Sequence, residues 1–578
     1  MKNLIKFLIT GLMAIVMGSC IDVLNQDPVD RISDAVVWQS EEYIEGYVVD
    51  LYARLPIISF HAGFIKSTYE ATGNVNDQNQ WNFTTGGMSS TSESHGYWNY
   101  GYIRDINIFL EEIGDSPIFE RTRDRLEGEV RAIRAMVYFE KQKRYGGVPL
   151  VDEVIDPFEE IPERFLVRST EEQIADFIDQ ELERAIELLE ENDTPKGRIN
   201  RWTAYAVKAR ANLWAASIAK FGTVDGEVGI PAGRADEFYG KAAAAATAVI
   251  ESGRYSLYDE FTDRKENYYN LFLDQSNSEV IFERVFDGVN IGHSFNNASP
   301  PTRFSDGHGA GVNPLLERLL MYENIDGSDD QPEFGPDHLY VDGSEPWANK
   351  DPRLHASVLF QGEEAWGTTI QSYEGLDPDP TPNPGAIISD HAVQYEGIET
   401  VGIDSRRYLA ETNTSSGFYN RKYVHDTPLV STNRDDTNWI EYRLGEMYLT
   451  LAEAEFELGN TGPAATALNA TRERAGISLV DAGSIAQERV RLERLNELAQ
   501  ENHAWWDHRR WRNAIEYLNR TEPLSGLRTI LHYETGQYYF LDLEAEVFTR
   551  HFRVEHYYHP ITESRIENQP QLTQNPGY

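Results

Sequence analysis

Residues 202–220 read WTAYAVKARANLWAASIAK, and residues 235–252 read ADEFYGKAAAAATAVIES. Alanine recurs through both stretches, the first also carries large aromatic side chains, and Gly253 follows the second. Small side chains let two helix backbones approach closely, and a glycine suits the left-handed conformation that often ends a helix. The two stretches therefore predict two helices that pack against each other.

Two further segments have the same helical character. The sequence STEE at 169–172 has the pattern of a capping box, and apolar residues then recur at steps of three and four up to Leu189. Between 442 and 475, an apolar stretch ends at Gly459 and an alanine-rich stretch follows. A helix, a short glycine turn and an alanine-rich partner are typical of a tetratricopeptide unit, whose period is about 34 residues. We therefore expect an all-α fold with a tetratricopeptide-like scaffold of helix pairs.

Residues 288–435 differ in composition from both flanks. They include the run DPDPTPNPG at 377–385, many Asn, Asp, Gly and Ser residues, and aromatic residues scattered singly. A shorter segment of similar character runs from Thr72 to Tyr102. Loops on a rigid scaffold commonly carry binding function, so we expect a large irregular face that binds a ligand. The predicted divisions are a leader at 1–19, a helical region at 20–287, a loop-rich insertion at 288–435 and a C-terminal helical region at 436–578.

The first twenty residues indicate export. Lys2 and Lys6 flank the start of an apolar run, and Met17-Gly18-Ser19 leads to Cys20, the single cysteine of the chain. Small residues before a cysteine at the end of such a run are typical of a lipoprotein signal peptide, and the run is shorter than the about 20 residues of a membrane span. We expect the mature chain to begin at a lipidated Cys20. An ordinary cleaved leader with a chance cysteine is the alternative.

The net charge of the chain limits its partners. It is −42, and removal of Lys2 and Lys6 with the leader makes it −44. Nucleic acids and anionic headgroups repel such a chain, so we expect no nucleic-acid partner, and a neutral ligand would avoid this repulsion. Trp505, Trp506 and Trp511 lie beside arginines, but we interpret them as core aromatics of a helical region.

Nothing in the sequence singles out a catalytic, cofactor or metal site. His551, His556 and His559 lack the helical ligand spacing of a metal-dependent hydrolase. Residues 324–330 loosely resemble a calcium loop, but the bidentate glutamate is not at the required spacing. A glycoside hydrolase would need two carboxyl groups about 5 to 10 Å apart, and no pair stands out among 94 acidic residues. From the residues alone we therefore expect no cofactor and no metal, and an exported glycoside hydrolase stays open as the alternative to a binding protein.

Short motifs follow one another through more than five hundred residues. They are the Cys20 signal followed by Asp27-Pro28, GEVRAIRA at 128–135, YGGVPL at 145–150, NKDPRL at 349–354, RERAG at 472–476, YHPI at 558–561 and QNPGY at 574–578. Each is weak alone. In this order they resemble the SusD/RagB family of outer-membrane lipoproteins of Bacteroidetes.

This resemblance implies a helical scaffold with a loop-built face. It implies a lipid-anchored protein on the outer membrane, facing out of the cell, where it lies over a SusC-like TonB-dependent transporter. Such proteins capture oligosaccharides and pass them to the transporter. A RagB-like peptide-binding protein, or a protein adaptor on the same scaffold, is the alternative. The motifs mark the scaffold and not the binding loops, so the identity of the ligand stays open.

Exposed aromatic residues of the two loop regions are the predicted ligand site, because the C–H face of a sugar ring stacks on indole and phenol rings. The candidates are Trp81, Trp98, Trp347, Trp366 and Tyr373. Neighbouring amides expected to bond sugar hydroxyls are Asn79, Asn99 and Asn349. Trp98 also falls at helical spacing with Tyr102, which favours a core position equally, and a loop tryptophan can instead pin its own loop.

Overall fold

The computed structural model describes residues 37–60, 62–74, 84–156, 158–191, 195–305, 307–427 and 431–578. The leader, Cys20, Asn79 and Trp81 lie outside these ranges, so the expectations about them stay predictions. In the ranges described, every helix is too short or too polar to span a bilayer.

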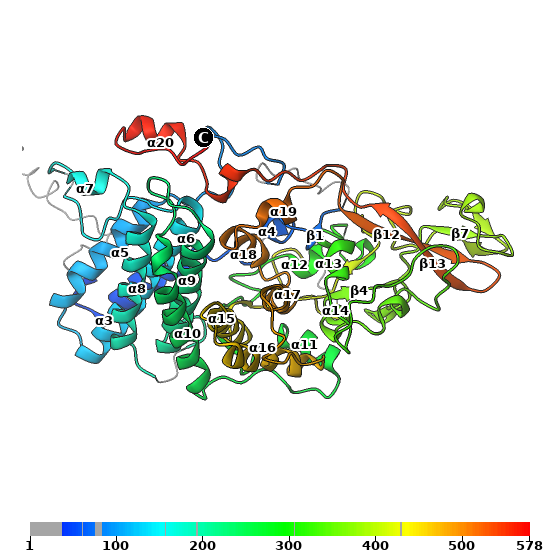
Figure 1. Cartoon of the computed structure of the whole chain (residues 1–578), viewed down its shortest axis with the longest axis horizontal. Coiled ribbons are helices and arrows are strands. Elements are labelled where there is room, and N and C mark those ends of the chain that lie inside the picture. The colour runs from blue at the N-terminus through cyan, green and yellow to red at the C-terminus, as the bar shows by residue number, and fades with distance from the viewer. Residues whose placement is uncertain are drawn as a thin grey trace, which may run out of the picture.

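The N-terminal half is built from packed helices (Figure 1). They are α3 (Glu41–Ala53), α5 (Tyr100–Glu112), α6 (Glu120–Tyr145), α8 (Glu171–Leu188), α9 (Arg201–Phe221) and α10 (Ala235–Glu251). Helix α6 packs on α8, α8 on α9, and α9 on α10; α10 then packs on α15 (Leu444–Glu457), which pairs with α16 (Thr461–Ala475). The two stretches quoted first are thus a packed helix pair. The assignment of the pairs as tetratricopeptide units stays a prediction.

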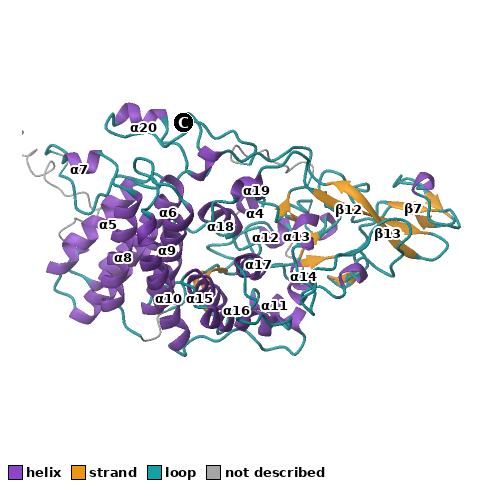
Figure 2. Ribbon diagram, viewed as in Figure 1, coloured by secondary structure: helices purple, strands orange, loops and turns teal. Residues whose placement is uncertain are grey.

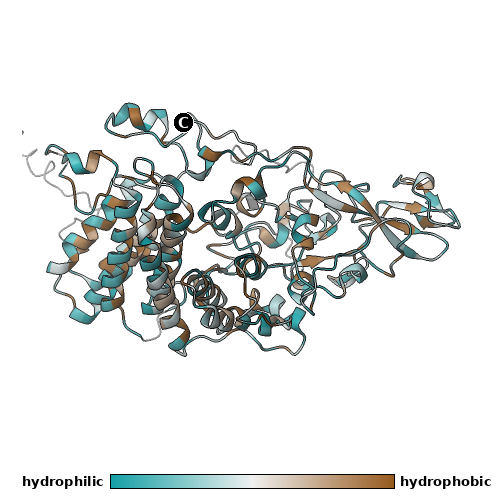
Figure 3. Cartoon of the chain, in the orientation of Figure 1, coloured by the Kyte–Doolittle hydropathy of each residue, from teal (hydrophilic) through white to brown (hydrophobic). Residues whose placement is uncertain are grey.

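Local signals set the ends of these helices. At α8 the Thr170 side chain accepts from the Gln173 N–H, and the Gln173 side chain accepts from the Thr170 N–H. This capping box lies one residue later than predicted. Gly253 (φ +65°) follows α10, and Gly476 (φ +75°) caps α16. Such caps satisfy backbone groups that the helix leaves unpaired. Along the helices, hydrophilic and hydrophobic residues alternate, as Figure 3 shows.

The other end of the molecule contains β-structure (Figure 2). Strands β12 (Ser525–His532) and β13 (Gln537–Glu544) form an antiparallel hairpin, and β7 (Gly375–Asp377) pairs with β12 in parallel. Near the helices, β2 (Val280–Arg284) pairs with β11 (Trp439–Arg443). The all-α prediction is therefore correct for the mostly helical bulk and wrong for this end. The sequence does contain a signal for the β12–β13 hairpin, because two eight-residue runs are separated by a short turn that ends in Gly536.

The remaining helices and strands are short. The helices are α4 (Ala62–Ile65), α7 (Glu163–Leu166), α11 (Arg264–Leu271), α12 (Phe295–Ala298), α13 (Leu316–Leu320), α14 (Pro352–Ser357), α17 (Gln487–Glu497), α18 (Ala504–Arg510), α19 (Ala514–Leu518) and α20 (Glu563–Asn568). The strands are β1 (Ala71–Thr72), β3 (Asn313–Pro314), β4 (Val358–Leu359), β5 (Glu364–Ala365), β6 (Thr368–Thr369), β8 (Gln394–Tyr395), β9 (Ile398–Glu399) and β10 (Tyr419–Asn420).

The C-terminal segment returns to the N-terminal helices, where α20 lies at their end in Figure 1. Asn575 Nδ2 donates to the carbonyl oxygens of Tyr145 and His559, and Arg168 donates to Asn575 Oδ1. The motifs at 145–150, 558–561 and 574–578 therefore meet in space. Their role in this structure is to fasten the chain end to the scaffold.

A buried network of ion pairs surrounds α17. Glu497 accepts from Arg353 at 2.8 Å, from Arg443 at 2.6 Å and from Arg474. Glu493 in turn pairs with Arg353 and with Arg472, and all of these side chains are almost completely buried. The motifs at 349–354 and 472–476 thus supply arginines that join the loop-rich region to the helices.

Candidate functional site

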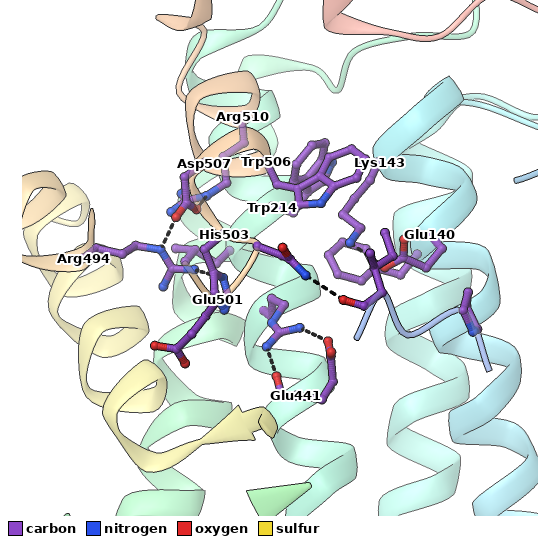
Figure 4. Close-up of a pocket in the computed structure, with 16 residues that line it drawn as sticks. Glu140, Lys143, Trp214, Glu441, Arg494, Glu501, His503, Trp506, Asp507 and Arg510 are labelled. Carbon is purple, nitrogen blue, oxygen red and sulfur yellow. Dashed lines mark hydrogen bonds and ion pairs between the residues drawn. The ribbon is translucent and has the colours of Figure 1, made fainter. Parts of the chain in front are cut away.

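The cavity drawn in Figure 4 lies between α6, α9 and α18 and is lined by charged side chains. Its volume is about 60 Å³, which suits a few water molecules and not a sugar ring. Its charges compensate one another, since Arg494 donates to Asp507 at 2.9 Å and Arg210 pairs with Glu441 at 2.7 Å. We regard this cavity as part of the scaffold.

Two tryptophans lie on α18, and a third, Trp511, directly follows that helix. Trp505, Trp506 and Trp511 are buried, which confirms the expectation that they are core aromatics. The Lys143 ammonium lies 4.6 Å from the centre of the Trp506 ring. Burial lowers the pKa of neighbouring His503 well below its usual value, and the nearby arginines add to this effect, so His503 is neutral at pH 7.

Two of the predicted ligand aromatics are buried. Trp347 is 0% exposed and packs against Phe360, Phe334 and Phe418, with ring centres 5.9, 5.9 and 6.2 Å away. Tyr373 is 6% exposed, and its hydroxyl donates to the Glu399 carbonyl at 3.0 Å. Their burial contradicts the expectation that these two side chains are exposed. The loop-rich segment wraps a small apolar core of its own, and Trp347 lies in it.

Trp98 packs at the interface between α6 and the C-terminal segment. Its ring makes edge contacts with Tyr145 at 4.9 Å and Tyr100 at 5.6 Å, and the Arg565 guanidinium lies 4.8 Å from its centre. Asn99 caps α5, because its Oδ1 accepts from the Tyr102 N–H at 3.1 Å. These contacts give both residues a scaffold role, the alternative that helical spacing had indicated for Trp98.

Trp366 and Phe304 form a partly buried aromatic pair in the loop-rich region. Their ring centres are 4.9 Å apart, and Trp366 Nε1 donates to the His425 carbonyl at 2.8 Å. Trp366 and Gly367 form the two-residue turn between β5 and β6, with φ of +51° and +72°. Such turns favour Asn and Gly, and a bulky residue held in this conformation marks candidate functional sites.

Polar groups border this aromatic pair. Arg303 donates to both carboxylate oxygens of Asp404, at 2.8 and 2.7 Å, and its guanidinium lies 4.6 Å from the Phe304 ring centre. Burial raises the pKa of Asp404, although Arg303 opposes this shift. We call Arg303, Phe304, Trp366 and Asp404 the Phe304–Trp366 face. An apolar platform with a few placed polar groups can bind and orient a sugar.

Residues 71–74, which precede Trp81 in the sequence, pack against the loop-rich region. Strand β1 pairs with β3, Asn74 Nδ2 donates to the Gly309 carbonyl at 2.8 Å, and Ser415 Oγ donates to the Gly73 carbonyl at 2.7 Å. Gly309 follows Phe304 by five residues. The structure therefore places the start of the first predicted loop region against the second.

The calcium-like loop at 324–330 binds a side chain of the protein. Lys350 Nζ lies 3.0 Å from the Asp330 carbonyl and 3.2 Å from Gln331 Oε1. The surrounding cleft has a volume of about 430 Å³ and includes Asn349, but the described residues that line it include no aromatic side chain. The cleft thus lacks the stacking surface that a sugar ring would use.

A second acidic group has ligand atoms close enough for a metal ion. His425, Asp435 and Asp436 offer atoms within 4.8 Å of one another. However, Asp435 already accepts from Thr437 and from the Asn296 N–H, and His425 Nε2 is bonded to Thr437 Oγ1. These bonds already engage the Asp435 carboxylate and His425 Nε2 within the protein.

Both the N-terminal and the C-terminal part of the chain match profiles of SusD-type proteins. The profile of the SusD family matches residues 278–578, and a profile described as starch-binding and associating with the outer membrane matches residues 24–213. SusD-like protein P38 of Formosa agariphila is 24% identical over 560 residues, which cover 91% of this chain and 95% of that protein.

Solved structures share the fold. A SusD-like protein from Bacteroides fragilis has a TM-score of 0.72 and 25% identity, covering 96% of this chain and all of that one. A laminarin-binding SusD-like protein has a TM-score of 0.60 and 20% identity, covering 93% of this chain and all of that one.

Proposed function

Because the chain belongs to the SusD family, we propose that it binds a glycan at the cell surface through the Phe304–Trp366 face. The observation that carries this proposal is Trp366 itself, held at the tip of a tight hairpin with φ +51° and with its ring tilted against that of Phe304. A turn position that favours small residues is an unfavourable place for an indole, and such strained positions are typical of functional sites. The name of the laminarin-binding structural relative supports the same ligand class.

Removal of the aromatic platform is expected to weaken glycan binding. Phe304→Ala and Trp366→Ala should each raise the dissociation constant roughly tenfold, or about 1.4 kcal/mol, because a stacking surface is lost. Trp366→Phe should retain part of the affinity. Binding is measured by affinity gel electrophoresis on a panel of polysaccharides that includes laminarin, followed by calorimetry with the oligosaccharide that binds.

The matched control is Phe158→Ala, which removes an aromatic ring that is 96% exposed elsewhere on the surface. It should bind like wild type, and all variants must keep the wild-type melting curve. Unchanged affinity in a folded Phe304→Ala, Trp366→Ala double variant would rule out this face as the site. Retention of peptides without any glycan would instead favour the RagB-like alternative. We also propose binding without catalysis, so the glycan should show no new reducing ends.

We further propose that Cys20 is lipidated and that the protein passes its ligand to a TonB-dependent transporter. The small residues before Cys20 support the first statement, and family membership supports the second. Metabolic labelling with a palmitate analogue should mark wild type and not Cys20→Ala. Affinity purification of wild type in mild detergent should recover a large β-barrel protein in near-equal amount. Equal labelling of both forms would contradict lipidation, and repeated recovery of the protein alone would contradict the complex.

A further inference from the structure

Three arginines converge on one carboxylate at the β-rich end of this acidic protein. Arg406, Arg407 and Arg528 place guanidinium nitrogens 3.2, 3.6 and 3.9 Å from the carboxylate oxygens of Glu374. The Glu374 side chain is only 1% exposed. Three positive charges against one negative charge leave a local excess of two, although the chain as a whole carries −42.

The guanidinium groups have more donors than Glu374 can satisfy. Each arginine offers five N–H groups, whereas Glu374 offers two oxygens. The Arg528 Nε is buried and has no hydrogen-bond partner among the described residues, since its 3.9 Å approach to Glu374 is too long for one. The side chain of Arg407 is 47% exposed. The exposed donors of Arg407 thus remain available to an oxyanion that approaches from solvent.

The cluster is held by regular structure. Arg528 lies on β12, and the Glu374 N–H donates to the Thr529 carbonyl at 2.8 Å. The turn that carries Arg406 and Arg407 is fixed by bonds from the Gly402 N–H to the Tyr373 carbonyl and from the Asp404 N–H to the Gln371 carbonyl, at 2.9 and 2.8 Å. The arginines are therefore positioned before any ligand arrives, which reduces the entropy lost on binding.

Groups suited to a sugar ring adjoin the arginines. Tyr408 follows Arg407, is 39% exposed, and lies with its ring centre 5.9 Å from that of His391. Ser389, two residues before His391, accepts a hydrogen bond from Arg528. The same turn reaches the Phe304–Trp366 face, because Asp404, two residues before Arg406, pairs with Arg303.

We propose that Arg406, Arg407 and Arg528 bind the carboxylate or sulfate of an acidic glycan whose sugar rings also contact the Phe304–Trp366 face. This inference rests on the proposed function and names its ligand class. Guanidinium groups bind such oxyanions through charge-assisted, often bidentate hydrogen bonds. The general repulsion from a negative protein acts at longer range and is screened within about 8 to 10 Å at physiological salt. The net charge alone had favoured a neutral ligand; the arginine cluster instead favours an anionic one.

Matched glycan pairs test the proposal. The first pair is polygalacturonate and its methyl ester, and the second is a sulfated galactan and its desulfated form; the two pairs distinguish carboxylate from sulfate. We expect wild type to bind the acidic member of one pair at least tenfold more tightly. Arg406→Gln, Arg407→Gln should reduce that affinity about tenfold and leave binding of the neutral member unchanged.

The control is Arg121→Gln, Arg184→Gln, which removes the same charge from exposed positions of the helical region. It should bind like wild type. If the double variant of the cluster does not fold, Arg407→Gln alone provides the test. Equal affinity of wild type for both members, unchanged acidic binding in the cluster variant, or no binding of any of the four glycans would overturn the proposal. If Trp366→Ala then still weakens binding of a neutral glycan roughly tenfold, the proposed function survives without this inference.

Discussion

Glu497→Ala is expected to lower the free energy of unfolding by about 3 to 5 kcal/mol. Glu497 is fully buried and accepts from Arg353, Arg443 and Arg474. Its removal takes one carboxylate from three buried guanidinium groups, each of which keeps another carboxylate partner. The network is then left with an uncompensated buried positive charge, which is far more unfavourable than the loss of an exposed pair. Urea denaturation followed by tryptophan fluorescence measures the change.

Glu497 should also make the free energy of unfolding depend on pH. Although burial opposes ionisation, Arg474, Arg443 and Arg353 hold the pKa of Glu497 well below its ordinary value of 4.5. The carboxylate therefore stabilises the fold above pH 4.5, and this contribution is lost as the pH falls toward the lowered pKa of the folded state. Wild type should lose stability below pH 4.5 more steeply than the Glu497→Ala variant.

The control is Arg184→Ala, which breaks an exposed pair with Glu187 and should change the free energy of unfolding by less than about 1 kcal/mol. A comparable loss in both variants would contradict the role of the buried network.

Trp347→Ala is expected to destabilise the protein by about 3 to 5 kcal/mol. The indole fills the core beneath the loop-rich region, between Phe334, Phe360 and Phe418. Truncation removes its apolar contacts and leaves a cavity that the surrounding aromatics fill only in part. Trp347→Phe should destabilise less, because one ring is kept. The measurement is the urea midpoint together with the melting temperature.

This prediction also separates packing from binding. At a temperature where Trp347→Ala stays folded, its affinity for the glycan should equal that of wild type, whereas Trp366→Ala should keep its stability and lose affinity. A folded Trp347→Ala variant with wild-type stability and weakened binding would reverse the roles assigned to the two tryptophans.

Local patterns predicted the helices well because helix formation depends on neighbours within a few residues. The alanine-rich stretches became α9 and α10, and the signals before Glu171 and at Gly253 lie at helix ends. The hairpin β12–β13 was missed, although its two runs and turn are visible in the sequence. The pairing of β7 with β12 joins residues about 150 positions apart, and no local pattern carries that information.

The roles of the loop aromatics could not be read in the same way. Trp347 and Trp366 both lie in aperiodic sequence, and yet one is enclosed by Phe334, Phe360 and Phe418 while the other occupies a hairpin tip. Phe304 and Arg303 were not singled out, because only the fold places them beside Trp366 and Asp404. The sequence Trp366-Gly367 between two short polar strands was the one local signal for this site.

The sequence by itself determined the helical scaffold, the strongly negative charge and the motifs of the family, because periodicity, composition and short motifs are properties of the chain in any conformation. Only the tertiary structure decided which aromatic rings are buried, which arginines of the motifs pair with Glu493 and Glu497, and that Arg406, Arg407 and Arg528 meet at Glu374. Burial and charge pairing depend on distances between residues remote along the chain, and packing alone sets those distances.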